Sequence, residues 1–102
     1  MYRARDRVDE RDRLADLDAA ADELGVSEAA RTTARDLYLS DVPETERSKP
    51  PTLAASLYAG ALVEGDQRSQ SAVAEAMGVS RVAVQQRWKD LLRGAGLEAP
   101  NW

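Results

Sequence analysis

The sequence predicts a single all-α domain. Alanine, leucine and valine supply most of an apolar share of 43%, while phenylalanine is absent and aromatic residues make up only 5%. A β-sheet core favours β-branched and aromatic side chains, so this composition favours helices around a thin core. A chain of 102 residues is long enough for one hydrophobic core and too short for two. We therefore expect residues 1–102 to form one bundle of five helices.

The first helix is expected from Asp9 to Leu24, where Leu14, Leu17 and Ala21 recur at helical spacing and Gly25 ends the pattern. Charged side chains crowd this segment and the residues before it. We interpret them as a solvated face that pairs with itself. A phosphate-binding arm is the alternative, because three arginines lie four residues apart: Arg3, Arg7 and Arg11. Residues 1–8 and 95–102 are expected to be flexible.

The second helix is expected to begin after Ser27, a good N-cap, and to end before Pro43. Its buried stripe comprises Ala30, Ala34, Leu37 and Tyr38. Residues 43–51 then form a polar, proline-bounded linker that is too polar to belong to the core. The third helix is expected from Thr52 to Gly65 and is apolar on nearly every side, which predicts a central position. Tyr58 is expected in its core, with the hydroxyl at the rim.

Residues 69–93 predict a helix-turn-helix. Ser69 and Ser80 are natural N-caps for its two helices, and Gly78 between them can adopt the positive φ that ends the first helix. A small alanine lets the helices cross closely, and a valine four residues into the second helix points back at it. Four residues are expected to hold the motif together: Ala74, Gly78, Val84 and Trp88. Such a unit presents its second helix to a DNA major groove.

The charge distribution sets this motif apart from the rest of the chain. The net charge is −4, and residues 1–50 hold nine basic and thirteen acidic side chains. Residues 67–102 hold five basic and three acidic side chains, so the motif is locally positive. The acidic surface, with only two lysines, suits a protein of a high-salt cytoplasm; an ordinary acidic protein is the alternative.

Several function classes are not supported. The chain has no cysteine and no histidine, which excludes thiol chemistry and Cys or His metal sites. It has no phosphate-binding loop, nucleophile motif or calcium loop, so we expect no catalytic residues, no metal and no cofactor. No apolar run reaches about 18 residues and the N-terminus lacks a signal-peptide core, which predicts a soluble, cytoplasmic protein.

The segment from Pro50 to Leu92 resembles a known family. Ala-Ala-x-x-Tyr in the third helix, Arg-x-Gln before the motif, Val-Ala-Glu in its first helix and Gly-Val-Ser-x-Val in its turn carry the likeness. These are Ala54, Ala55, Tyr58, Arg68, Gln70, Val73, Ala74, Glu75 and Gly78 to Val82. Together they resemble the second cyclin-like repeat of archaeal transcription factor B, the counterpart of TFIIB. The resemblance implies a cyclin-like bundle with a C-terminal helix-turn-helix.

The resemblance also implies a DNA-binding transcription factor that docks beside the TATA box, with TATA-binding protein as a partner. In the family, the residues at the positions of Val82 and Gln85 contact bases, and the family has arginine where this chain has Gln85. Arginine pairs with guanine whereas glutamine suits adenine, so this departure alters the expected base preference.

Candidate contacts follow from the exposed start of the second motif helix. The base-reading candidates are Ser80, Arg81, Val82, Gln85 and Gln86. The phosphate-binding candidates are Arg68, Ser69, Arg87, Lys89 and Arg93. The alternative is that these are solvated helix charges, with Arg87 pairing with Asp90.

A complete factor B also has a zinc ribbon and a second repeat. We therefore interpret this chain as a stand-alone single-repeat relative or as part of a longer protein. The alternative function is a cyclin-box module that binds proteins without reading DNA. A homodimer is a further hypothesis, because two copies would rebuild a two-repeat clamp.

Overall fold

The computed structural model describes the backbone of residues 4–100 and the side chains of residues 10–100. Within that part the chain forms five α-helices, one short 3₁₀ helix and no strand, so the predicted all-α five-helix bundle is confirmed. The elements are, in order, α1 (Ala4–Leu24), α2 (Glu28–Ser40), η1 (Glu46–Ser48), α3 (Lys49–Val63), α4 (Gln70–Met77) and α5 (Arg81–Gly94).

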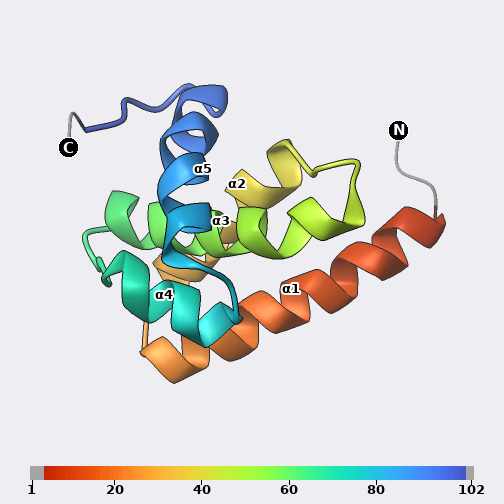
Figure 1. Cartoon of the computed structure of the whole chain (residues 1–102), viewed down its shortest axis with the longest axis horizontal. Coiled ribbons are helices and arrows are strands. Elements are labelled where there is room, and N and C mark those ends of the chain that lie inside the picture. Colours follow the sequence, from red (N-terminus) through yellow and green to blue (C-terminus); the bar gives the residue numbers. More distant parts are fainter. Residues whose placement is uncertain (1–3, 101–102) are drawn as a thin grey trace.

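The apolar helix α3 lies in the centre and packs against each of the other α-helices (Figure 1). Every residue from Thr52 to Ala61 is buried, as expected for a helix that is apolar on nearly every side. α2 approaches α3 so closely at Gly60 that a Cβ atom there would lie 2.7 Å from the backbone nitrogen of Ala34. The slim α3 therefore lets its neighbours surround it.

α1 begins at Ala4, earlier than the expected start at Asp9. Residues 4–8 contain alanine and arginine, which are good helix formers, so the charged segment extends the helix instead of fraying. Part of the segment expected to be flexible is thus helical. Arg3 and the side chain of Arg7 lie outside the described residues, as do residues 101–102 of the tail. Residues 95–100 follow α5 without helix.

The start of α3 corrects a second expectation. The helix begins at Lys49 and not at Thr52, because Pro50 and Pro51 occupy its first turn, where a missing N–H costs nothing. Residues 43–51 are also not purely a polar linker. η1 folds part of this segment, and the side chain of Lys49 is buried.

Lys49 belongs to a buried polar cluster that joins three helices. Glu10 of α1 is only 5% exposed, and its carboxylate accepts hydrogen bonds from the Nζ atom of Lys49 at 3.0 Å and from the hydroxyl of Tyr38 at 2.6 Å. The hydrogen bond to Glu10 is the main reason why the pKa of Lys49 lies above its ordinary value. We call Glu10, Tyr38 and Lys49 the polar cluster. The sequence did not predict it.

The charges of α1 pair chiefly with other elements. Asp18 accepts a hydrogen bond from Arg35 of α2 at 2.6 Å, and Asp22 forms an ion pair with Arg31, also of α2. Arg13 binds Glu46 of η1 at 2.9 Å and lies 4.0 Å from Asp16 of its own helix. The self-pairing predicted for Arg13 is present as the longer contact to Asp16, and Glu46 supplies the closer partner.

Candidate nucleic-acid interface

α4 and α5 form the helix-turn-helix. Gly78 adopts a φ of +69° at the end of α4, and Val79 donates its N–H to the carbonyl of Ala74 at 3.0 Å. Ser80 then caps α5, its hydroxyl accepting a hydrogen bond from the backbone nitrogen of Ala83 at 3.1 Å. Ser69 caps α4 in the same way, with Ala72 as donor at 3.0 Å. These caps fix where each helix begins.

One face of α5 holds the helix to the core. Val84 and Trp88 are fully buried, and Ala74 of α4 is 3% exposed. The Trp88 ring meets the Tyr58 ring edge-on, with centroids 5.2 Å apart. Gln67 donates a hydrogen bond to the Tyr58 hydroxyl at 3.1 Å, so this core tyrosine has its polar atom at the rim, as expected. This aromatic pair anchors α5 to α3.

The opposite face of α5 points to solvent. Val82, Gln85, Gln86 and Lys89 follow the i, i+3, i+4, i+7 spacing that places side chains in one stripe. Val82 is 54% exposed although it is apolar, and both glutamines are exposed. With Arg81 and Ser80, also exposed, at the free N-terminus, the predicted base-reading residues lie together on one accessible end of the helix.

The phosphate candidates on α5 differ in how far they are engaged. Arg87 lies on the flank of the helix and donates to the carbonyl of Ala83 at 3.2 Å. The Nζ atom of Lys89 lies 5.5 Å from the centroid of the Trp88 ring. The expected pairing of Arg87 with Asp90 is not present, because Arg93 binds Asp90 at 3.3 Å. Lys89 thus belongs to the exposed stripe, and Arg93 follows it one helical turn later.

Arg68 has a structural task that the sequence did not reveal. Its Nε atom donates to the carbonyl of Leu24 at 3.0 Å, and its Nη2 atom donates to the carbonyl of Gly25 at 3.1 Å. Its Nη1 atom binds the Asp66 carboxylate at 2.8 Å. That carboxylate also accepts the backbone N–H of Ser27 at 2.7 Å. We call Asp66 and Arg68 the corner bracket, because they tie the α1–α2 corner to the loop before α4.

The corner bracket supplies partners that the ends of the helices require. The last carbonyls of α1 and the first N–H groups of α2 have no partner within their own helices. The hydrogen bond from Arg68, followed by the one from the Ser27 backbone, lowers the pKa of Asp66. The signal that could have revealed this pair is Asp-x-Arg directly before a helix cap.

The structure offers no sign of a metal centre in the part it describes. Among those residues, no group of three or more acidic side chains is placed to hold a metal ion. Likewise, none of the helices in residues 4–100 is both long and apolar enough to cross a membrane.

Comparison with known proteins agrees with this geometry. The family model described as the transcription factor TFIIB repeat matches residues 11–94, from within α1 to the end of α5. The chain belongs to the TFIIB-repeat family. The matched region includes every predicted contact residue of the helix-turn-helix, and it confirms the resemblance of the sequence to factor B.

Three relatives illustrate the relationship. Transcription initiation factor IIB of Pyrococcus abyssi is 36% identical over 83 residues, covering 78% of this chain and 28% of the relative. Transcription initiation factor IIB 2 of Thermococcus kodakarensis is 36% identical over 87 residues, covering 82% of this chain and 28% of the relative. Transcription initiation factor IIB 2 of Haloferax volcanii is 40% identical over 76 residues, covering 71% of this chain and 23% of the relative. The chain thus spans about a quarter of the length of these relatives.

Proposed function

We propose that this chain is a transcription factor that docks α5 in the major groove of promoter DNA. The observation that carries the proposal is the exposed stripe of Val82, Gln85, Gln86 and Lys89 on a helix whose other face is fixed by Trp88. A helix-turn-helix places the N-terminal residues of its second helix near base edges. The names of the relatives, transcription initiation factors, support the same class.

The charges around the stripe suit a polyanion. Residues 67–102 carry five basic and three acidic side chains on a chain whose net charge is −4. Lys89 lies in the stripe and Arg93 follows it one turn later, while the N-terminus of α5 adds backbone donors and a positive dipole end. We propose that these groups position the helix on the phosphates. Arg68 is left out, because its donors are already bound within the corner bracket.

The side chains of the stripe favour particular bases. Glutamine can donate to and accept from the major-groove edge of adenine, and an exposed valine can contact the methyl group of thymine. Gln85 and Gln86 with Val82 therefore favour A·T pairs. The family resemblance further implies a site beside the TATA box, with TATA-binding protein on the same DNA.

Selection from randomised DNA, followed by gel shifts, tests the proposal. Arg81→Ala and Gln85→Ala are each expected to weaken binding to the selected site by about tenfold, since a good base contact contributes about 1–3 kcal/mol. Gln85→Arg is expected to shift the preference toward guanine. Thr32→Ala, on the exposed surface of α2, is the matched control and should change nothing. Unchanged affinity and preference in Arg81→Ala and Gln85→Ala would refute DNA reading by α5.

Salt and partner titrations separate this function from a protein-binding cyclin box. Binding to DNA should weaken linearly in a log–log plot against salt, whereas an apolar protein interface should hold or tighten. The same gel shifts with and without TATA-binding protein test the joint complex. Sedimentation with and without DNA tests the homodimer, which is excluded if only monomer is observed.

A further inference from the structure

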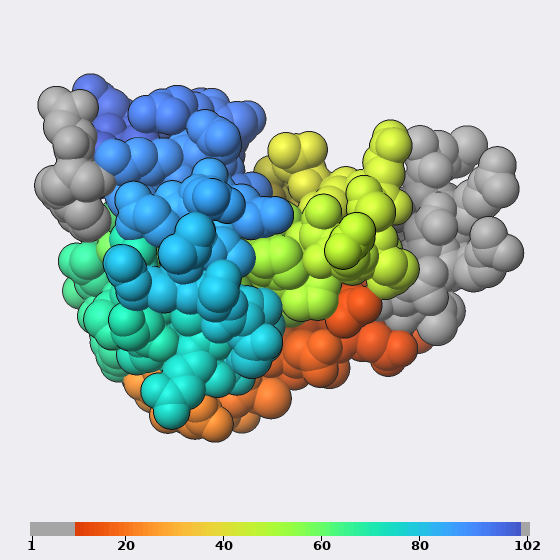
Figure 2. Space-filling model, viewed as in Figure 1, coloured from red at the N-terminus to blue at the C-terminus, as the bar shows by residue number. Residues whose placement is uncertain are grey.

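A groove runs beside the helix-turn-helix on the face shown in Figure 2. It lies between α1, the start of α3 and the turn that ends α4, and it encloses about 520 Å³. Sites that bury a ligand or a partner's side chains commonly enclose about 300–1,000 Å³. We call this hollow the α1–α4 groove. None of the predicted DNA contacts lines it, so it requires an explanation of its own.

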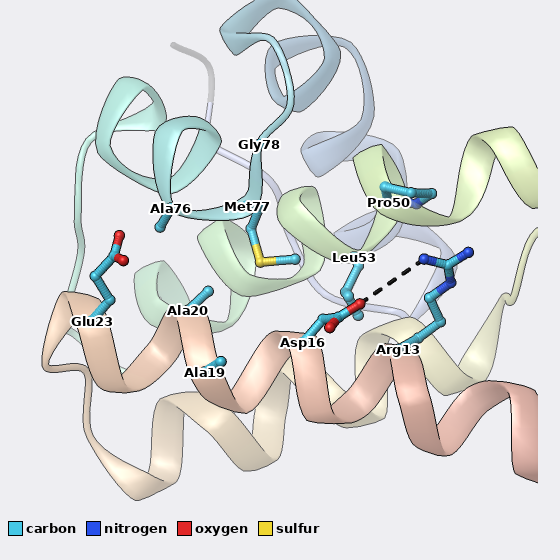
Figure 3. A pocket seen from close by; sticks show the side chains of 10 residues that line it. All are labelled: Arg13, Asp16, Ala19, Ala20, Glu23, Pro50, Leu53, Ala76, Met77 and Gly78. Atoms are coloured by element: carbon cyan, nitrogen blue, oxygen red, sulfur yellow. Dashed lines mark ion pairs between the residues drawn. The ribbon is translucent and has the colours of Figure 1, made fainter.

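One wall of the α1–α4 groove is acidic. Asp16, Ala19 and Glu23 are exposed residues of α1 that line it at the spacing i, i+3, i+7 (Figure 3). Seven residues of α-helix rise about 10 Å, or two turns. The wall therefore presents two carboxylates two turns apart with a methyl group between them.

The carboxylates of this wall are less well neutralised than those on the side of α1 that faces α2. Asp18 and Asp22, on the side facing α2, each pair closely with an arginine of that helix. Asp16 has only Arg13 at 4.0 Å, and Arg13 is bound more closely by Glu46. No cation among residues 10–100 forms an ion pair with Glu23. Arg13 also lines the groove beside Asp16, so the lining holds two carboxylates and one guanidinium, with Glu23 at the end away from that cation. The groove therefore has a net negative charge, and Glu23 is its unpaired carboxylate.

The floor and the other wall are apolar. Ala20 and Leu53 line the floor, and the Met77 side chain projects into the hollow from the end of α4 (Figure 3). Methionine adapts its shape to a partner because it is unbranched and polarisable. Small side chains along α1 leave room for a helix to approach closely.

We propose that the α1–α4 groove binds an amphipathic helix of a partner protein, with basic residues seven positions apart and a large apolar residue between them. The two cations would pair with Asp16 and Glu23, and the apolar residue would pack against Met77 and Leu53. This is helix-in-groove recognition, in which an apolar face lies in a groove and charges at its edge set the register. The proposal does not depend on DNA binding.

The probe is a fluorescent alanine-based helical peptide carrying Lys-x-x-Leu-x-x-x-Lys, with a second peptide in which glutamate replaces both lysines. Anisotropy should show saturable binding of the lysine peptide and none of the glutamate peptide. The chain has two methionines, so NMR of ¹³C-labelled methyl groups gives a direct reading of Met77. Its methyl signal should shift on titration. The proposal is overturned if the lysine peptide does not bind, or if it binds without shifting the methyl signal of Met77.

Matched variants test the charges. Asp16→Lys combined with Glu23→Lys should weaken binding of the lysine peptide by at least about tenfold. The same variant should bind the glutamate peptide. Asp36→Lys combined with Glu44→Lys makes the same charge change at exposed residues that do not line the groove, and should leave affinity within about twofold. Equal losses in both variants would mean general electrostatic attraction and overturn the site.

Two further outcomes are decisive. Ala19→Trp fills the groove without changing charge and should abolish binding of the lysine peptide, while circular dichroism confirms the fold. Sedimentation could also show that the free chain forms a dimer and that Asp16→Lys with Glu23→Lys makes it monomeric. That result would assign the groove to a second copy of the chain and overturn the proposal of a partner helix.

Discussion

Arg68 shows how one side chain can position the helix-turn-helix through contacts within the chain. Its guanidinium binds two carbonyls at the end of α1 and the carboxylate of Asp66, so the loop before α4 is fixed to the α1–α2 corner. A phosphate contact was expected from its charge and its place just ahead of Ser69. The geometry instead favours a positioning residue, because an arginine with its donors satisfied gains little from moving to a phosphate.

Arg68→Ala is expected to lower stability by about 2 kcal/mol, because several hydrogen bonds to a charged group are lost. It should also weaken DNA binding while leaving the salt dependence unchanged. Lys89→Ala, in contrast, should reduce the log–log salt slope by about one, as removal of a phosphate contact does. Binding isotherms at several salt concentrations make the comparison. A reduced slope for Arg68→Ala would restore its role as a phosphate contact.

Asp66 makes the corner bracket sensitive to acid. Its folded pKa is depressed, chiefly by the hydrogen bond from Arg68, so its contribution to stability is present above the unfolded pKa of about 3.9. That contribution is lost as the pH falls through the lower folded value. The melting temperature of the wild type should therefore fall more steeply between about pH 5 and pH 2 than that of Asp66→Asn. Parallel curves for the two proteins would contradict this prediction.

At the scale of helices, the close packing of α2 on α3 depends on a glycine. The crossing of α2 and α3 has no room for a side chain at Gly60, where a Cβ atom would lie 2.8 Å from the carbonyl oxygen of Ala30. The three nearest atoms at this point all belong to the backbone of α2, which cannot rotate aside as a side chain can. The third helix therefore needs a glycine here because of its partner and not because of its own conformation.

Gly60→Ala is expected to destabilise the chain by about 1–3 kcal/mol, because the helices must separate to admit the methyl group. Gly94→Ala is the matched control. That glycine is also helical, but a Cβ atom there meets open space, so the change should be neutral or stabilise by up to about 1 kcal/mol. Urea denaturation of both variants measures the difference. Equal stability of the two would refute the close crossing.

At the scale of the whole molecule, the polar cluster joins segments that are far apart in the chain. Glu10 and Lys49 are 39 residues apart, and Tyr38 comes from a third helix. Their side chains meet in the one place where α1, α2 and the start of α3 converge. The same convergence orients α1, whose outer residues form the acidic wall of the α1–α4 groove.

Lys49→Met is expected to cost about 3 kcal/mol, because it leaves the carboxylate of Glu10 buried without its cation. Adding Glu10→Gln to that variant should recover part of the loss, since a neutral amide costs less to bury than an unpaired charge. Denaturation of the two single variants and the double variant forms a mutant cycle. Strict additivity would show that the pair is not coupled in the folded chain.

The sequence predicted the elements well because the signals for them are local. The apolar spacing in residues 53–65, the serine caps at Ser69 and Ser80, and the turn glycine Gly78 each act within a few residues. The sequence predicts the start of α3 too late, because two consecutive prolines indicate a linker as readily as a first helical turn. The exposed stripe of α5 also followed from spacing alone.

What only the tertiary structure decided are the contacts between residues that are distant in sequence. Arg68 and Leu24 are 44 residues apart, and no periodicity or cap relates them. A charged side chain looks the same in the sequence whether solvent, a phosphate or a distant carbonyl will satisfy it. The sequence by itself thus determined five helices and a helix-turn-helix, because hydrogen bonding and side-chain period along a helix are local. The fold decided which charged side chains pair within the molecule and which stay exposed to partners.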